Sequence, residues 1–174
     1  MISSPAYRTA SARIVLLLMA LCFISHFNRI SMAVAGTERI IGQYGIEPEQ
    51  MGRVYSAFLL VYTLVMTAGG YFIDRFGVRK ALLFVAVGSG VFAAVTGLVG
   101  YALTYATQLL IALVVVRGAM GLFTAPLHPA AAKTISDWIP HEKRTWSNGL
   151  VTGAAIFGSA AAPPLFGRLT ERVD

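Results

Sequence analysis

Residues 70–80 read Gly-Tyr-Phe-Ile-Asp-Arg-Phe-Gly-Val-Arg-Lys, and this stretch decides the fold. It stands between two apolar runs, Met51–Tyr71 and Ala81–Leu103. Each run has about the length that a helix needs to cross roughly 30 Å of hydrocarbon. The charges between the runs cannot lie in lipid, so the stretch belongs at a membrane face. It therefore predicts two membrane-spanning helices joined by a short charged turn.

The residue types in this turn suggest their roles. Gly70 is expected to let two helix ends approach closely, and Gly77 to supply a backbone turn that a larger residue would resist. Asp74 is expected to accept hydrogen bonds from free N–H groups at a helix start. Three cationic side chains are expected to hold the turn at an anionic leaflet: Arg75, Arg79 and Lys80.

The spacing G-x-x-x-D-R-x-G-x-R-K resembles the loop between the second and third helices of major facilitator superfamily transporters. The plainer alternative is a basic loop placed by the positive-inside rule, which explains the charges but not the glycines or Asp74. The resemblance implies an all-α polytopic membrane fold built from two six-helix halves. The chain would then be an incomplete N-terminal half, a single domain over residues 1–174, and a fragment whose facing C-terminal half is missing.

Composition agrees with a polytopic membrane protein. The chain is 56% hydrophobic and 13% charged, about half the charge of a soluble domain. Its net charge of +6 comes from residues clustered in short loops, so it does not indicate a nucleic-acid partner. Cys22 is the only cysteine, which excludes a disulfide within the chain. No spacing suggests a metal site, and no cofactor is expected.

Five spans are predicted, with uncertain ends. They cover about Ile14–Ala35, Met51–Tyr71, Ala81–Leu103, Gln108–His128 and Arg144–Gly167. The first could instead be a signal peptide, because arginines precede it and Ala33-Val34-Ala35 looks like a cleavage site. The stretch stays mostly apolar past Phe27, however, and four more runs follow, so a first transmembrane helix is the preferred interpretation.

Loop charges predict the orientation. Eight Lys and Arg residues fall on the side of the N-terminus: Arg8, Arg13, Arg75, Arg79, Lys80, Lys133, Lys143 and Arg144. Four fall on the other side: Arg39, Arg53, Arg168 and Arg172. The larger set marks the cytoplasm, so the N-terminus is expected inside a cytoplasmic membrane and Asp174 outside.

The connecting segments carry further expectations. Gly36–Gln50 is predicted to be an external loop. Pro129–Lys143 is predicted to lie along the interface, with Trp138 anchored at headgroup level. In the fifth span, small residues followed by Pro163-Pro164 predict a kinked, closely packed helix that rocks during transport, although packing alone would also explain them.

Two charges remain inside the predicted spans, Arg29 and Arg117, and no Asp or Glu accompanies them there. Each such arginine costs ~2.5–3.5 kcal/mol near the bilayer centre, which favours a functional role. Arg29 is close enough to a helix end to reach the interface instead. Arg117 lies about ten residues from either end and cannot do so easily.

Helical spacing gathers polar residues around these arginines. The first, second and fourth spans each carry a stripe at intervals of three, four or seven: Ser25, His26, Arg29, Met32 and Ala33; Tyr55, Tyr62, Met66 and Gly70; and Arg117, Gly121, Thr124 and His128. Small residues here also suit tight helix packing. For His26 and His128, satisfaction by a neighbouring helix is the preferred interpretation.

Other residues narrow the resemblance to the anion:cation symporter branch. They are Asn28-Arg29, Tyr62 eight residues before Gly70, Arg117-x-x-x-Gly121, and a later stretch that begins Ser136-Asp137-Trp138-Ile139-Pro140. Members of this branch carry organic anions such as sugar acids. Proton-coupled members typically carry acidic residues where this chain has Asn28 and Thr124, neither of which titrates. Proton coupling through these carboxylates is therefore not expected, which leaves a different ion, a histidine such as His26, or facilitated diffusion. A glutamine common in the second helix of the branch is replaced by Met66.

The sequence therefore predicts secondary or facilitative transport of a small organic anion by alternating access. The expected substrate-binding residues are Arg29, Arg117, Tyr62, His26 and Thr124. The expected conformational residues are Gly70, Asp74, Arg75, Gly77, Arg79 and Lys80. The alternative is a non-transporting membrane subunit or regulator. An intramembrane enzyme is not supported, because no cluster of nucleophile and base lies in the spans.

Overall fold

The computed structural model describes residues 5–170, and over these residues the chain is helical. The elements in chain order are α1 (Pro5–Ala35), a π-helical turn η1 (Gly36–Ile40), α2 (Ile41–Tyr44), α3 (Pro48–Phe76), α4 (Val78–Ala102), α5 (Ala106–Thr124), α6 (Leu127–Trp138) and α7 (His141–Thr170). Five stretches in this range are long and apolar enough to cross a membrane, which confirms the five predicted spans: Thr9–Ala35, Pro48–Phe76, Val78–Ala102, Ala106–Trp138 and His141–Phe166.

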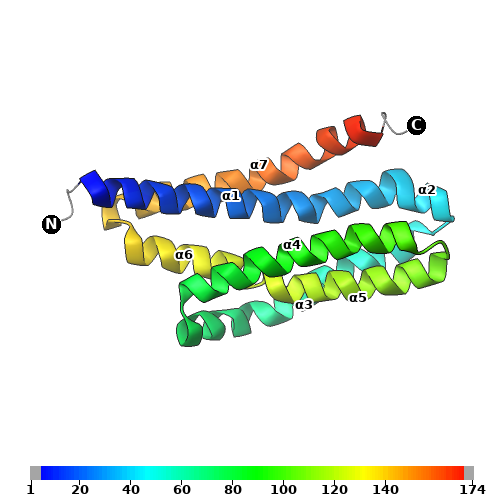
Figure 1. Ribbon diagram of the computed structural model, residues 1–174, viewed down its shortest axis with the longest axis horizontal. Coiled ribbons are helices and arrows are strands. Elements are labelled where there is room, and N and C mark those ends of the chain that lie inside the picture. The colour runs from blue at the N-terminus through cyan, green and yellow to red at the C-terminus, as the bar shows by residue number, and fades with distance from the viewer. Residues whose placement is uncertain (1–4, 171–174) are drawn as a thin grey trace.

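The helices lie side by side along the long axis of the molecule (Figure 1). α1 and α7 pack along each other on one side of the bundle. On the other side α5 packs against both α3 and α4. α6 contacts α1, α3, α4 and α7 and so joins the two sides near one end of the bundle. The architecture is an all-α bundle of spanning helices.

Apolar side chains fill the interior in separate clusters. One joins the helices around α6 through residues such as Leu18, Cys22 and Ile135. Another lies toward the opposite end and includes Met51 and Leu113. Large apolar side chains also cover much of the outer surface. In a chain that is apolar inside and out, hydrophobic burial adds little to helix association in lipid, and close packing matters more.

Glycines permit the closest approaches between helices. A Cβ added to Gly121 on α5 would lie 2.6 Å from the carbonyl oxygen of Phe58 on α3. A Cβ added to Gly158 on α7 would collide with the backbone of Phe23 on α1. Both positions are small-residue contacts of the kind that lets helix backbones pack in a membrane.

The turn at residues 70–80 differs from the prediction in three respects. α3 continues to Phe76, and Gly77 alone separates it from α4 with φ +84°, which confirms the backbone turn at that glycine. Asp74 lies in the C-terminal turns of α3, so its predicted position at a helix start is wrong. A Cβ added to Gly70 would meet nothing within 4 Å, whereas one added to Gly69 would lie 3.3 Å from Pro126 Cα. One residue rotates the helix face by about 100°, so the close contact passes to the neighbouring glycine.

The predicted interfacial segment Pro129–Lys143 is also wrong for most of its length. Residues up to Trp138 form α6, which extends the fourth span after a two-residue break. Pro126 is the residue before α6, and Pro129 lies in its first turn, where a missing N–H breaks no helical bond. Arg144 then donates to the carbonyl oxygens of Ile139 and Ser136 and satisfies the end of α6.

The predicted loop Gly36–Gln50 is largely helical. The π-helical turn η1 continues α1, and α2 ends at Gly45 with φ +62°. Glu47 then starts α3 with a reciprocal cap, in which its backbone N–H donates to Gln50 Oε1 at 3.2 Å. Most predicted spans are shorter than the helices, because the predicted ends were set at charged and capping residues, which in fact lie inside the terminal turns.

Two further expectations concern helix ends. Acidic residues do lie in helices, contrary to the prediction, but in the terminal turns: Asp74, Asp137 and Glu142 are examples. α7 continues through Pro163 and Pro164 to Thr170, and toward this end it diverges from α1 (Figure 1). The expected outside position of Asp174 and the charge of Arg172 fall outside the described residues.

Candidate functional site

Arg117 is a buried cation without an anionic partner in the described chain. It lies on α5, and only 6% of the residue is exposed. One terminal nitrogen lies 3.6 Å from the sulfur of Met120, one turn further along the same helix. Its Nε has no hydrogen-bond partner among residues 5–170. A thioether is a weak acceptor, so the guanidinium retains most of its capacity to donate hydrogen bonds.

The guanidinium of Arg117 borders a cavity of about 350 Å³ between α1, α4 and α5. The lining is mostly apolar, with polar groups from Asn28, Ser31 and Thr96. Ser31 and Thr96 donate their hydroxyl protons to carbonyl groups of their own helices, each at 2.7 Å. Their oxygens can still accept, whereas Arg117 and the Asn28 amide can donate. An apolar cavity of this size with a few convergent donors suits a small anionic ligand.

Arg29 is held by aromatic rings. Its guanidinium carbon lies 5.4 Å from the ring centroid of Phe58 and 6.0 Å from that of Tyr62, both on α3. These two rings stack on each other at 5.8 Å. Such cation–π contacts stabilise an arginine within a protein by ~0.5–2 kcal/mol. The side chain therefore faces the bundle interior and does not snorkel to the interface.

The remaining predicted polar residues gather around Arg29. A second, small cavity of about 10 Å³ is lined by Ser25, His26, Arg29, Phe58, Tyr62, Thr124, Leu127 and His128. The imidazole of His26 lies edge-on to that of His128, with 5.3 Å between ring centroids. Thr124 donates its hydroxyl proton to the carbonyl oxygen of Met120 at 2.9 Å. This cavity has room for about one water and not for an organic anion.

The predicted stripes thus converge, but on two cavities. Four of the five predicted substrate residues meet in the small one: His26, Arg29, Tyr62 and Thr124. Arg117 borders the large one. Among the residues lining either cavity there is no Asp or Glu. Beyond Tyr62 the second-span stripe does not reach either cavity: Met66 is 42% exposed and lines neither.

Sequence reasoning missed several residues at these cavities. Phe58 precedes Tyr62 by one helical turn, so i,i+4 spacing could have found it as a ring partner. Ser31 lies on a face of α1 adjacent to the predicted stripe. Thr96 comes from α4, on which no stripe was predicted. Nothing in the local pattern of Thr96 marks it, since its contact with the cavity depends on how α4 crosses α1.

The residues predicted to control conformation lie at a charged end of the bundle. Asp74 Oδ1 accepts a hydrogen bond from Lys133 Nζ on α6 at 2.5 Å, in an exposed ion pair. Arg75 donates to the Tyr71 hydroxyl at 3.3 Å. Arg79 and Lys80 are exposed in the first turn of α4. Lys133 was not among the predicted conformational residues, and its pairing joins two helices that the sequence separates by 59 positions.

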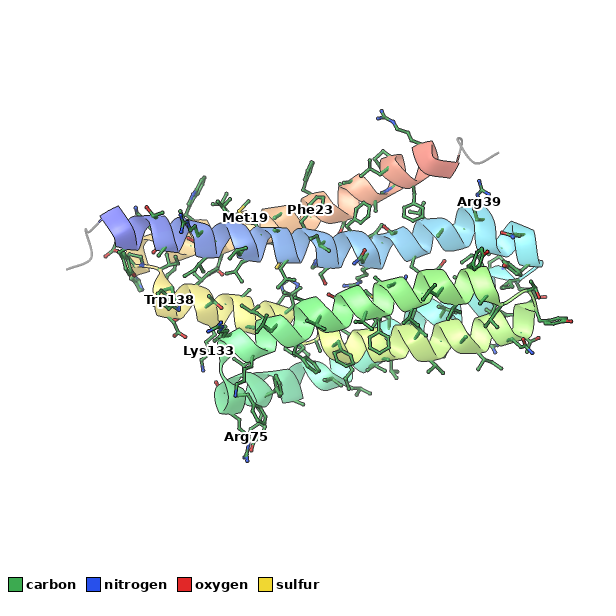
Figure 2. All side chains as sticks on the ribbon, viewed as in Figure 1. Met19, Phe23, Arg39, Arg75, Lys133 and Trp138 are labelled. Atoms are coloured by element: carbon green, nitrogen blue, oxygen red, sulfur yellow. The ribbon has the colours of Figure 1, made fainter. Side chains whose placement is uncertain are left out.

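The basic groups lie at opposite ends of the bundle as the charge sorting requires. Figure 2 shows Arg75, Lys133 and Trp138 near the end where α1 begins, and Arg39 at the other end. Trp138 is 50% exposed, and its carbonyl oxygen accepts a 2.8 Å hydrogen bond from Tyr7. The geometry therefore places the N-terminal part of α1 and the charged turn on one side of any membrane that the bundle spans.

Five apolar spanning helices around interior arginines define a multi-pass helical membrane protein. The family model described as Major Facilitator Superfamily matches residues 18–174. The chain belongs to the Major Facilitator Superfamily, as the charged turn led us to expect.

Curated relatives give the similarity more detail. The chain is 32% identical over 142 residues to a D-galactonate transporter of Escherichia coli, a match that covers 82% of the chain and 31% of the relative. It is 30% identical over 143 residues to a probable sulfoacetate transporter of Cupriavidus necator, with the same shares covered. It is 27% identical over 160 residues to a probable galactarate/D-glucarate transporter of Escherichia coli, covering 92% of the chain and 35% of the relative. The chain thus spans about a third of the length of these relatives.

Proposed function

We propose that this protein transports a small organic anion, such as a sugar acid or another carboxylate, across the cytoplasmic membrane by alternating access. The observation that carries the proposal is the buried guanidinium of Arg117, which has no anionic partner in the described chain and borders a cavity of about 350 Å³. A buried charge without a partner is costly, and a bound anion offsets that cost. Relatives named as galactonate, galactarate/glucarate and sulfoacetate transporters support the class of ligand.

In this proposal Arg117 binds the carboxylate through its planar fork of donors. Asn28, which lines the same cavity from α1, donates to the hydroxyl or carboxyl oxygens of the same ligand. Arg29 and Tyr62 belong to the binding surface in a second conformation, because their cavity is too small for the anion here. His26 and Thr124 line that same surface.

The remaining parts of the protein complete the cycle. We assign the facing side of the substrate site to a C-terminal half, since the chain spans about a third of its relatives. The turn containing Gly70, Asp74, Arg75, Gly77, Arg79 and Lys80 holds one conformation through contacts at the membrane face. The N-terminus and this turn face the cytoplasm, the side favoured by positive charge.

Uptake by the full-length protein in proteoliposomes tests the proposal. The panel contains D-galactonate, D-glucarate, galactarate and sulfoacetate, with an uncharged sugar as the negative control. We expect saturable uptake of at least one anion, and a loss of about tenfold or more in Arg117→Ala, because hydrogen bonds to a charged group contribute ~1.5–3 kcal/mol each. Arg53→Gln is the matched control, since Arg53 is exposed, pairs with Glu49 and lines neither cavity. Reconstituted protein that moves none of the anions, and binds none, favours the non-transporting subunit instead.

A further inference from the structure

Two histidines from separate helices meet beside Arg29. His26 lies on α1 and His128 on α6, and their rings stand edge to face with centroids 5.3 Å apart. The Nδ1 of His26 lies 3.1 Å from the carbonyl oxygen of Cys22. A carbonyl oxygen can only accept, so Nδ1 carries the proton in the neutral ring. The lone pair of that ring is therefore on Nε2, where a second proton would bind.

The surroundings of the pair make its charge depend on a ligand. Arg29 is one turn from His26 on the same helix and lines the same small cavity. Other titratable or charged groups on the packed elements include Cys22 on α1, Tyr55 and Tyr62 on α3, Arg117 on α5, and Lys133 and Asp137 toward the far end of α6. Further ones lie toward the ends of α1 and α3: Arg8, Arg13, Glu49, Arg53, Tyr71, Asp74 and Arg75. α4 between Ala81 and Gly100 and α7 between Thr145 and Gly167 contribute none.

None of the groups lining the small cavity is a carboxylate, so nothing there neutralises Arg29. Adding a proton to the histidines would place a second positive charge next to the guanidinium. In a site with little water this repulsion is strong. In the second conformation, in which Arg29 belongs to the binding surface, a ligand carboxylate beside Arg29 removes the repulsion and favours the protonated pair.

We propose that the His26–His128 pair binds one proton together with the transported anion. The proton comes from water on the side from which the anion enters, adds to an imidazole nitrogen of the pair, and returns to water when the anion leaves. Adjacent imidazolium ions repel each other, so the pair holds one proton and titrates as a unit. This inference rests on the proposed function and adds a coupling ion to it. It gives the chain a titrating group where the resemblance expects carboxylates and the sequence has Asn28 and Thr124.

Coupling of this kind is reciprocal. If the anion favours the protonated pair, then protonation must raise the affinity for the anion by the same factor. A sugar-acid carboxylate stays ionised between pH 5.5 and 7.5, so the ligand itself adds no pH dependence over that range. Affinity should therefore rise as pH falls, and only while both histidines are present.

The test measures D-galactonate binding to the full-length protein by calorimetry at pH 5.5 and 7.5, with D-glucarate as the second probe. We expect roughly tenfold tighter binding at pH 5.5, and proton uptake approaching one per anion near neutral pH in buffers of different ionisation enthalpy. His26→Gln and His128→Gln should each reduce the pH effect to less than about twofold and abolish proton uptake. His141→Gln is the matched control, because that histidine is exposed at the start of α7.

A measurement on the wild-type protein keeps the test decisive even if the substituted proteins misfold. Histidine nitrogen NMR of the wild-type protein near neutral pH should show two ring signals moving toward the imidazolium form when D-galactonate is added. Wild-type protein that binds the anion equally at both pH values, without proton uptake, overturns the role of the pair and leaves the proposed function standing. A pH effect on anion affinity that persists when His26→Gln and His128→Gln are combined overturns the role of the pair as well. A wild-type protein that binds none of the four anions of the uptake panel at either pH overturns the proposed function and the coupling together.

Discussion

Arg29 and Arg117 are the same residue type in opposite surroundings. Arg29 has two aromatic rings within 6.0 Å and a cavity with space for about one water. Arg117 is 94% buried, has an Nε without a partner, and borders an open cavity. The first is stabilised by the protein in this conformation, whereas the second keeps hydrogen-bond donors unsatisfied beside the cavity. The sequence identifies both arginines as charges inside apolar spans, but only the structure shows that their surroundings differ.

The ion pair between Asp74 and Lys133 leads to a prediction at the same scale. Asp74 follows Tyr62 by twelve residues of α3, roughly 18 Å along the helix axis. The pair is exposed, so solvent screens it and its contribution to folding stability is small. We therefore expect Asp74→Asn and Lys133→Gln to slow transport several-fold while anion affinity stays within about twofold.

Transport rates and equilibrium binding, measured on the two single variants and their double variant, check this prediction. If the pair acts as a unit, the double variant should be no slower than either single variant. Arg53→Gln, which breaks the exposed pair with Glu49 at the other end of α3, should leave the rate unchanged. A loss of affinity in Asp74→Asn as large as that in Arg117→Ala would show that Asp74 belongs to the binding site.

The elements themselves were largely predictable because length and helical periodicity set them. The five apolar runs in the sequence correspond to five spanning helices. The stripes that carry His26, Arg29, Tyr62 and Thr124 converge on one cavity, as their spacing predicts. The continuation of the fourth span into α6 was not predicted. The predicted span ended before Pro129, yet the N–H of Ala130 bonds to the carbonyl oxygen of Pro126 at 3.0 Å, so the new helix starts almost at once. Proline in a first turn costs no helical hydrogen bond, and sequence pattern alone does not distinguish that position from a helix end.

The contact between α3 and α5 gives a prediction about helix packing. Gly121→Ala places a Cβ 2.6 Å from the Phe58 carbonyl oxygen, a backbone atom that cannot move aside without shifting the helix. We expect this variant to lose ~1–3 kcal/mol of stability. Gly118→Ala is the matched control on the same helix, because its Cβ would meet only a Val61 methyl group at 3.7 Å. The control should be neutral or more stable by up to ~1 kcal/mol through helix propensity.

Unfolding of both variants in detergent, followed by helix content, measures the difference. The comparison is informative because each change adds one methyl group to α5. Equal stability of Gly121→Ala and Gly118→Ala would show that α3 and α5 do not pack as closely in the membrane as they do in the bundle described above.

At the scale of the whole molecule, the distribution of charge predicts sidedness. The charged turn, Lys133 and Trp138 lie near one end, and Arg39 lies at the other (Figure 2). The sequence predicted which basic loops share a side because each span reverses the chain. Contacts between distant segments, such as Asp74 with Lys133, depend instead on helix tilt and crossing, which no local pattern encodes.

Single cysteines test the sidedness in intact cells. The native Cys22 is buried and should give little background. Arg75→Cys should resist an impermeant thiol reagent until the cells are opened, whereas Gln43→Cys, on exposed α2, should react directly. Labelling of residue 75 in intact cells, with protection of residue 43, would invert the proposed orientation.

Anion binding by Arg117→Lys tests the central claim, that a buried guanidinium binds the transported carboxylate. Lysine retains the positive charge but lacks the planar fork of donors. For the full-length protein, equilibrium affinity for whichever anion the wild-type protein takes up should fall at least about tenfold in Arg117→Lys and further in Arg117→Ala. Arg53→Lys, the same change at an exposed ion pair, should bind as the wild-type protein does. Wild-type affinity in Arg117→Lys would contradict the account, since Arg117 would then supply only a structural charge.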